Sequence, residues 1–195
     1  MKIAVRTDIL ITAIASVARA ADDDNVQHAN RFGVHLRVAG GVLTVEATNR
    51  HWLARSRHTA EIADADGTTA MLVKRPAVKP LVAWLKSRAK AATLTLIDLA
   101  TGEFDGCGER YVIVPGHDAY PAVDAVVDIA TRERVADVDA IGVHAAYLTD
   151  ALASARNAAG KDANVTLSFG DALDPVLVTA THAPEWLAVV MPVRP

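Results

Sequence analysis

The chain has 195 residues, of which 51% are hydrophobic and 5% aromatic, and its formal net charge is −3. This length fits one large domain or two small ones, and no apolar run reaches the ~18 residues of a membrane span. The start, MKIAVRTDIL, lacks the long apolar stretch of a signal peptide. A single cysteine, Cys107, excludes an internal disulfide framework and is typical of a reducing compartment. We therefore expect a cytoplasmic protein with no membrane contact.

The N-terminal third of the chain predicts one strand, one helix and then three strands. Residues 2–5 form the first strand candidate, and apolar side chains recur at helical spacing over 7–21. The three strand candidates that follow, of which Gly40-Gly41 joins the first two, are 31–38, 41–48 and 52–62. Residues 64–67, DADG, form a turn that closes this round.

The same order of elements then occurs twice more. In the second round a strand at 69–74 precedes a helix that begins near Pro76, because proline is favoured at the first helical position. Its three strands are 93–99, 103–108 and 110–114. The third round consists of a strand at 139–145, a helix that carries Leu148 and Leu152, and strands at 164–170, 175–181 and 186–193. Residues 121–138 join the two rounds. Three such repeats predict an α+β fold, with antiparallel sheet on one side and helices on the other.

Three stretches carry a more specific signal. They are TVEATNRHWLA (44–54), AYPAVDAVV (119–127), and the closing segments HAAYLTDALAS, NVTLSFGDALDPVLV and WLAVVMPVR. The first resembles the Thr-Val-Ala-Thr-Asp-Gly-His-Arg-Leu-Ala stretch of bacterial sliding clamps, the β subunit of DNA polymerase III. The second resembles the linker between the clamp's second and third domains, and the third resembles its closing half-domain, which ends in Val-Val-Met-Pro-Met-Arg.

The resemblance implies the DNA-clamp fold, in which helices line a hole for duplex DNA and sheets face outward. A clamp domain consists of two strand–helix–three-strand units, and a clamp chain has three domains. Because this chain has three units, residues 1–127 correspond to a complete domain and 128–195 to a linker plus half a domain. Family rings contain twelve units, which favours a homo-oligomeric ring of four chains joined head to tail, with a dimer as the alternative.

The resemblance also implies a hydrophobic pocket that takes a short peptide of a DNA polymerase or a clamp loader. The matching positions in this sequence are Thr48, His51, Trp52, Leu53, Pro121, Val126, Val189, Met191, Pro192, Val193 and Arg194. Arg50 stands where the family has glycine, and Trp52 where it has arginine, so the pocket and its peptide preference should differ in detail. Alternation alone leaves a second interpretation open, in which Val189, Met191 and Val193 are only core residues.

Cations gather in the stretch KRPAVKPLVAWLKSRAK (74–90), which contains no acid. Facing duplex DNA, they would contact phosphates without reading sequence; the alternative is a solvated helix face. The residues that we expect to face DNA are Arg6, Arg19, Arg75, Lys79, Lys86, Arg88, Lys90 and Arg156.

Nothing in the sequence indicates an enzyme. The seven histidines show no metal-ligand spacing, Cys107 lacks a local Cys-His signature, and no glycine-rich nucleotide loop occurs. We therefore expect no cofactor and no metal. The function that the resemblance implies is a processivity factor that encircles DNA. The alternative is a clamp-like binding module that never closes a ring and caps or sequesters clamp partners.

Overall fold

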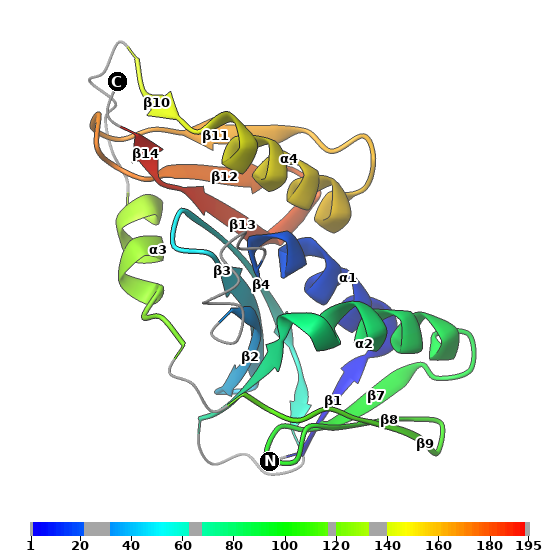
Figure 1. The fold of residues 1–195 in the computed structure, drawn as a ribbon. Helices are drawn as coiled ribbons and strands as arrows, with labels where there is room; N and C mark the ends of the chain where they lie inside the picture. The colour runs from blue at the N-terminus through cyan, green and yellow to red at the C-terminus, as the bar shows by residue number, and fades with distance from the viewer. Residues whose placement is uncertain (1, 22–31, 63–67, 117–119, 133–139, 194–195) are drawn as a thin grey trace.

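A computed structural model of the chain describes residues 2–21, 32–62, 68–116, 120–132 and 140–193. The three predicted repeats are present, and we call them unit 1 (2–62), unit 2 (69–116) and unit 3 (142–193). Each begins with a strand that leads directly into a helix, followed by three antiparallel strands (Figure 1). The predicted α+β class is confirmed.

Unit 1 contains β1 (Lys2–Arg6), α1 (Thr7–Val17), a 3-10 turn η1 (Ala18–Ala21), β2 (Gly33–Ala39), β3 (Val42–Thr48), β4 (Trp52–Thr59) and the two-residue β5 (Glu61–Ile62). The helix forms because Leu10, Ala13, Ile14 and Val17 recur at helical spacing, and all four are fully buried. A tight turn at Gly40 and Gly41, which both have positive φ, joins β2 to β3.

Unit 2 contains β6 (Thr69–Lys74), α2 (Arg75–Arg88), β7 (Leu94–Asp98), β8 (Glu103–Gly106) and β9 (Glu109–Val112). Unit 3 contains β10 (Gly142–Val143), α4 (Ala145–Ala159), β11 (Val165–Ser168), β12 (Val176–Ala180), β13 (Ala183–Val190) and β14 (Pro192–Val193). Between units 2 and 3 lies α3 (Asp124–Thr131), a helix that the sequence analysis treated only as a joining segment. It crosses residue 127, so the division into domains at that residue stays a prediction.

Units 1 and 2 exchange their first strands. β1 pairs antiparallel with β7 of unit 2, and β6 pairs antiparallel with β2 of unit 1. The resulting five-stranded sheet has the order β5-β1-β7-β8-β9, and the seven-stranded sheet has the order β11-β12-β13-β4-β3-β2-β6. Neither unit 1 nor unit 2 is complete without the other.

Unit 3 joins unit 1 through both layers of the structure. In the sheet, β13 pairs with β4 from Trp186 opposite Ser56 to Val190 opposite Trp52. In the helix layer, Asn157 Nδ2 donates to the Ala15 carbonyl (3.2 Å), and the side chain of Ser154 donates to the Ser16 carbonyl. These bonds satisfy carbonyls near the end of α1 that lack a partner within the helix.

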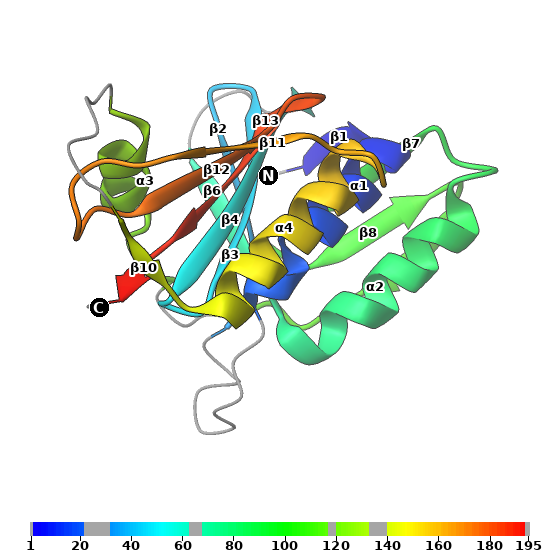
Figure 2. The same cartoon turned by 90° about the horizontal axis from the view of Figure 1, so that it is seen from above.

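The helices α4, α1 and α2 lie side by side on one face of the molecule, with the sheets behind them (Figure 2). The main core fills the space between these layers. A second, smaller core lies on the opposite face of the seven-stranded sheet, where α3 covers Leu53 and Val189 with its own Val123, Val127 and Ala130. This second core adjoins the candidate site.

Candidate peptide-binding site

The turn between β3 and β4 is fixed by two polar side chains. Asn49 Oδ1 accepts the backbone N–H groups of both His51 and Trp52 at 3.1 Å. Thr48 Oγ1 donates to the Trp52 carbonyl at 2.9 Å and accepts the N–H of Arg50 at 3.1 Å. Asparagine and threonine favour turns because their short side chains bond to nearby backbone groups. The turn therefore holds one wall of the site rigidly.

Beside this turn lies a hollow of about 210 Å³. Three chain segments build it: the β3–β4 turn, the start of α3, and the end of β13. Its lining residues are Thr48, Arg50, Trp52, Leu53, Pro121, Ala122, Val123, Val126, Val189 and Met191. Most of these side chains are apolar, so the hollow suits an apolar ligand group.

The alternating residues of the C-terminal segment pass from core to surface along one face. Val189 is fully buried in the second core, whereas Val193 is 41% exposed. Met191, between them, is half-buried and lines the hollow. Its backbone N–H donates to the His51 carbonyl at 2.9 Å, which ties this segment to the β3–β4 turn. The pocket and core interpretations thus each describe part of the segment.

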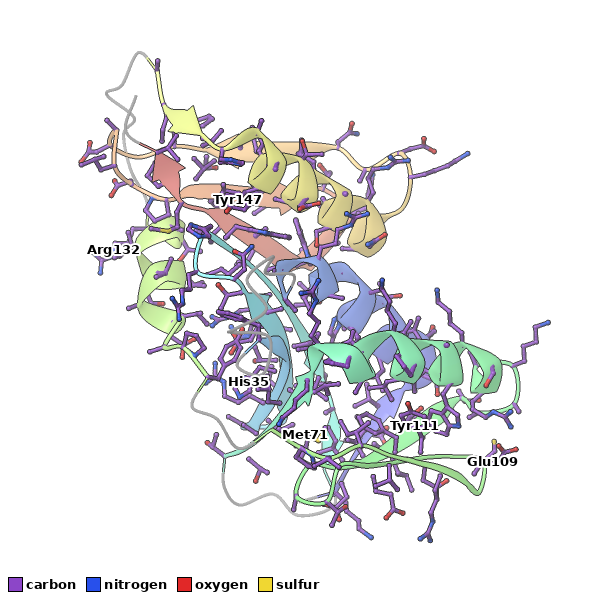
Figure 3. The ribbon with its side chains drawn as sticks, viewed as in Figure 1. His35, Met71, Glu109, Tyr111, Arg132 and Tyr147 are labelled. Atoms are coloured by element: carbon purple, nitrogen blue, oxygen red, sulfur yellow. The ribbon has the colours of Figure 1, made fainter. Side chains whose placement is uncertain are left out.

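The structure brings seven of the eleven predicted pocket residues to the hollow: Thr48, Trp52, Leu53, Pro121, Val126, Val189 and Met191. His51 does not line the hollow. It stacks on Tyr147 of α4, which is labelled in Figure 3, with ring centroids 5.0 Å apart. Pro192 and Val193 form β14, which pairs with β10. Arg194 lies outside the described residues. Three residues that line the hollow were missed as pocket residues: Arg50, Ala122 and Val123, all of which lie within the stretches that resemble the clamp.

Arg50 and Trp52 give the hollow its individual features. Arg50 has φ 77°, a backbone conformation that favours glycine, and its guanidinium lies 5.6 Å from the centre of the Phe32 ring. The indole of Trp52 is 1% exposed, and its Nε1–H has no hydrogen-bond partner in the described part of the chain. A buried donor without a partner costs free energy, and Trp52 packs in the main core.

An ion-pair network centred on the buried pair Arg55–Glu46 positions the wall that α3 contributes. Arg55 of β4 is 7% exposed and bonds to Glu46 at 2.7 Å and to Asp124, in the first turn of α3, at 2.6 Å. Asp124 also accepts Arg37 at 3.3 Å. The network therefore anchors the start of α3 to the sheet, and with it Pro121 to Val126.

Two aromatic side chains, His35 and Tyr120, adjoin this network. His35 Nδ1 lies 3.1 Å from Glu46, and the His35 ring stacks on Tyr120 at 4.3 Å (Figure 3). Burial by itself would raise the pKa of Glu46, but bonds from His35 and Arg55 outweigh it and hold that pKa below its usual value. Burial, with the nearby Glu46 charge, raises the pKa of Tyr120 well above its usual value.

The predicted DNA-facing cations are distributed unevenly over the helix layer. Lys79 and Lys86 are exposed on α2, beside a shallow apolar hollow of about 270 Å³ between α1 and α2. Lys90 lies exposed just beyond α2, Arg75 is half-buried at its start, and Arg156 is exposed on α4. Arg6, Arg19 and Arg88 pair with Asp8, Asp150 and Glu109 respectively, which reduces the charge that they offer to a partner.

The described residues contain no group of three or more histidine, cysteine or acidic side chains that could hold a metal ion. Among them, too, no helix has both the length and the apolar character needed to cross a bilayer.

The similarity of this chain to known proteins lies in its structure. No protein-family model matches the sequence, and no curated protein matches it. The DNA polymerase III β subunit of Pseudomonas aeruginosa superposes with a TM-score of 0.77 at 18% identity, over 100% of this chain and 66% of that one. The corresponding subunit of Thermotoga maritima gives 0.76 at 12% identity, with the same coverage of both chains.

A sliding clamp of Caulobacter crescentus, solved with polyethylene glycol in its putative β-motif tethering region, gives a TM-score of 0.75 at 20% identity, over 100% of this chain and 65% of that one. At these identities the likeness establishes the fold. The chain thus spans about two thirds of the length of the clamps that it matches, and its fold is that of the bacterial DNA sliding clamp, the β subunit of DNA polymerase III.

Proposed function

We propose that this protein is a DNA sliding clamp: a processivity factor that encircles duplex DNA, tethers a DNA polymerase through a hydrophobic peptide, and catalyses no reaction itself. A clamp loader would bind through the same peptide-binding hollow. The observation that carries the proposal is this hollow, built from three segments far apart in the sequence.

The chemistry of the hollow defines the ligand. Its apolar lining, with Leu53, Val126 and Met191, fits the aliphatic and aromatic side chains of a short linear segment. A peptide of the form Gln-x-x-Leu-x-Phe supplies one aliphatic and one aromatic side chain.

The helix layer supports a sequence-independent contact with DNA. Lys79 and Lys86 are exposed there on α2, a helix without acidic residues. Cations on a helix face contact phosphates without reading bases. Because α1 and α4 carry few free cations, binding should be weak and salt-dependent, and residence on DNA would depend on a closed ring. Twelve units, divided among chains of three, give a ring of four chains.

A fluorescence-polarisation titration with a labelled Gln-x-x-Leu-x-Phe peptide tests the hollow. We expect a Kd on the order of 1 µM, or about −8 kcal/mol. Met191→Ala should weaken binding at least about tenfold, or 1.4 kcal/mol, because it removes the adaptable side chain at the rim. The matched control is Leu173→Ala, which removes an apolar side chain that is 61% exposed and does not line the hollow. Equal affinity of the Met191 variant and the wild type would place the peptide elsewhere.

A clamp-like module that binds partners without closing a ring is the second candidate. It is favoured by one observation: the chain spans only 66% of the matched clamp, so it contains fewer units than that clamp. Retention on closed circular DNA, with loss after linearisation, distinguishes the two functions. Peptide binding without such retention would support the capping or sequestering module.

A further inference from the structure

The three units use their first strands in the same way on one side. In unit 1, β1 pairs with β5, which follows the unit's last strand. In unit 2, Leu72 of β6 forms a bridge to Gly116, again after the last strand. In unit 3, β10 pairs with β14, which follows β13. Unit 3 therefore has the same construction as the other two.

The units differ on the other side of the first strand. β1 pairs with β7, and β6 pairs with β2, so each first strand of the first two units completes the other unit's sheet. In unit 3, within the described residues, the second edge of β10 and the outer edge of β11 have no partner strand. Among the described strands, the one to be donated and the edge to receive it are therefore both present and both open.

Positions that the strand exchange buries in units 1 and 2 are only partly buried in unit 3. Four and two residues before the helix, unit 1 has Ile3 and Val5, and unit 2 has Met71 (labelled in Figure 3) and Val73. All four are at most 2% exposed. The equivalent residues of unit 3 are only half-buried: Ile141 and Val143.

The helix and the receiving strand repeat this difference. Three residues after the start of the helix, Leu10 is fully buried and Val78 is 5% exposed, whereas Leu148 of α4 is half-buried. On β11, Val165 and Leu167 face the core side, because they lie opposite the buried Ala180 and Val178 of β12, yet they too are only half-buried.

The open edge of β11 also lacks the protection that exposed strand edges carry. Lysine, other charges and proline on an edge strand oppose pairing with another chain. The sequence of β11 is VTLS, with none of these, whereas the edge strand β9 is ERYV and carries two charges. An edge without charge, beside half-buried apolar residues, is suited to pairing with another strand.

We propose that a second copy of this chain covers unit 3, by a reciprocal exchange of β10 onto β11 about a two-fold axis. Both open edges are then satisfied at once, because one copy donates β10 where the other offers β11. A single complete clamp-type domain results from two half-domains. The proposal depends on the fold and not on the DNA-related function.

The pairing register follows from the pairing of β1 with β7, because β7 and β11 can be aligned by their distance from the start of the preceding helix. Val5 lies opposite Thr95, and Ile3 opposite Ile97. Thr95 follows the start of α2 at Arg75 by twenty positions, and Val165 follows the start of α4 at Ala145 by the same twenty. Val143 of one copy therefore lies opposite Val165 of the other, and Ile141 opposite Leu167, which makes every inward pair apolar.

Each chain has three units, so one unit is left without a partner within the chain. The proposed exchange pairs that unit with its equivalent in a second copy. Two chains joined through unit 3 contain six units, with unit 2 at both ends. Two such dimers contain the twelve units of a ring, related by perpendicular two-fold axes and not head to tail. Unit 2 therefore lies at both ends of the dimer, where the second interface would form.

Cysteine cross-linking tests the register directly. In a Cys107→Ser background, which removes the sole cysteine, Val143→Cys/Val165→Cys should form a covalent dimer on mild oxidation, because opposite residues of paired strands bring their Cβ atoms within about 5.5 Å. The control pair, Val143→Cys/Ser168→Cys, places the second cysteine three residues away and on the other face of β11, and it should stay monomeric on a denaturing gel. Equal dimer yield from both pairs, or none from the first, would overturn the proposed register.

Native mass spectrometry of the intact chain at about 10 µM, where an interface of micromolar affinity is populated, should give even oligomers only. Leu148→Glu should weaken the dimer at least about a hundredfold, or 2.7 kcal/mol, whereas Leu173→Glu, on an exposed loop, should leave it intact. Circular dichroism of both variants checks the fold. A wild-type monomer at this concentration would overturn the proposal, and would point to a strand from another protein or from a longer chain as the cover.

Discussion

Replacing Arg55 by methionine is the sharpest test of how the peptide-binding hollow is held together. Arg55 is 7% exposed, Glu46 is 2% exposed, and their side chains are 2.7 Å apart. Methionine fills a similar volume but leaves Glu46 as a buried carboxylate whose remaining polar contact, among the described residues, is His35 at 3.1 Å. Removing one partner of a buried ion pair costs about 3–5 kcal/mol. We expect the lower end, about 3 kcal/mol, because His35 remains.

For a chain of this size, 1 kcal/mol changes the melting temperature by about 2–4 °C, so Arg55→Met should lower Tm by about 6–12 °C. Calorimetry and urea unfolding measure this. Arg57→Met is the matched control, since Arg57 is exposed two residues further along the same strand; it should change stability by less than about 0.5 kcal/mol. Peptide affinity should fall only in the Arg55 variant, because Asp124 loses its 2.6 Å anchor and α3 loosens.

The stability that Arg55→Met loses should depend on pH in a defined direction. In the wild type, the folded pKa of Glu46 lies below its usual value, so ionised Glu46 stabilises the fold above about pH 4.3 and this contribution disappears as the pH falls through the folded pKa. Without Arg55, only His35 is left to oppose the effect of burial, so the folded pKa of Glu46 should rise above its wild-type value. The difference between variant and wild type should therefore be largest near pH 7 and shrink towards about pH 4.

The double variant Glu46→Gln/Arg55→Met removes the buried, unpaired charge of Glu46 and should recover at least about half of the lost stability. If the double variant is as unstable as Arg55→Met, the lost stability comes from packing of the arginine stem and not from an unpaired carboxylate, and the electrostatic account of this wall is wrong.

Three further outcomes follow from individual contacts. Asn49→Ala leaves the N–H groups of His51 and Trp52 without their 3.1 Å acceptor, so urea unfolding should show a loss of about 1–3 kcal/mol, and an unchanged midpoint would mean that water replaces the side chain. Lys79→Glu/Lys86→Glu should abolish stimulation of a polymerase on primed circular DNA, whereas Lys2→Glu/Arg57→Glu, on the sheet side, should not; equal effects would indicate general charge and not a DNA-facing helix. In an alkaline absorbance titration, one of the three tyrosines should ionise well above the usual pKa, because Tyr120 is buried near Glu46; Tyr120→Phe should remove that step, and its persistence would assign it to another tyrosine.

The repeat architecture could be predicted because each strand and helix has its own local periodicity of hydrophobic residues. Strand–helix boundaries such as Lys74–Arg75 follow from a change of hydrophobic period and from Pro76. The helix α3 was missed because it is short, although Val123, Val127 and Ala130 recur at helical spacing and are buried. The exchange of β1 and β6 between units requires pairing over long sequence separation, which no local pattern encodes.

The candidate site also has features that could be predicted from the sequence and features that could not. The segments that line the hollow could be identified because they resemble a known family, and that resemblance also singled out Arg50, whose φ of 77° fits the glycine it replaces. The Glu46–Arg55–Asp124 network could not be identified, because Asp124 is 69 residues away from Arg55 in the sequence. Only the cross-strand pair of opposite charges, Glu46 and Arg55, left a signal in two neighbouring predicted strands.

The position of Met191 decides how the hollow and the proposed dimer can be separated experimentally. Val190 pairs with Trp52 in the sheet, and Pro192 pairs with Val143 of β10, so Met191 lies between a wall of the hollow and the strand proposed for exchange. A truncation after Val190 would remove β14 together with the rim, and a loss of peptide binding would then have two causes. Met191→Ala keeps both pairings, since its N–H bond to the His51 carbonyl belongs to the backbone. We therefore expect this variant to bind peptide at least about tenfold more weakly while the Val143–Val165 cross-link still forms; loss of the cross-link as well would mean that the rim and the dimer edge move as one element.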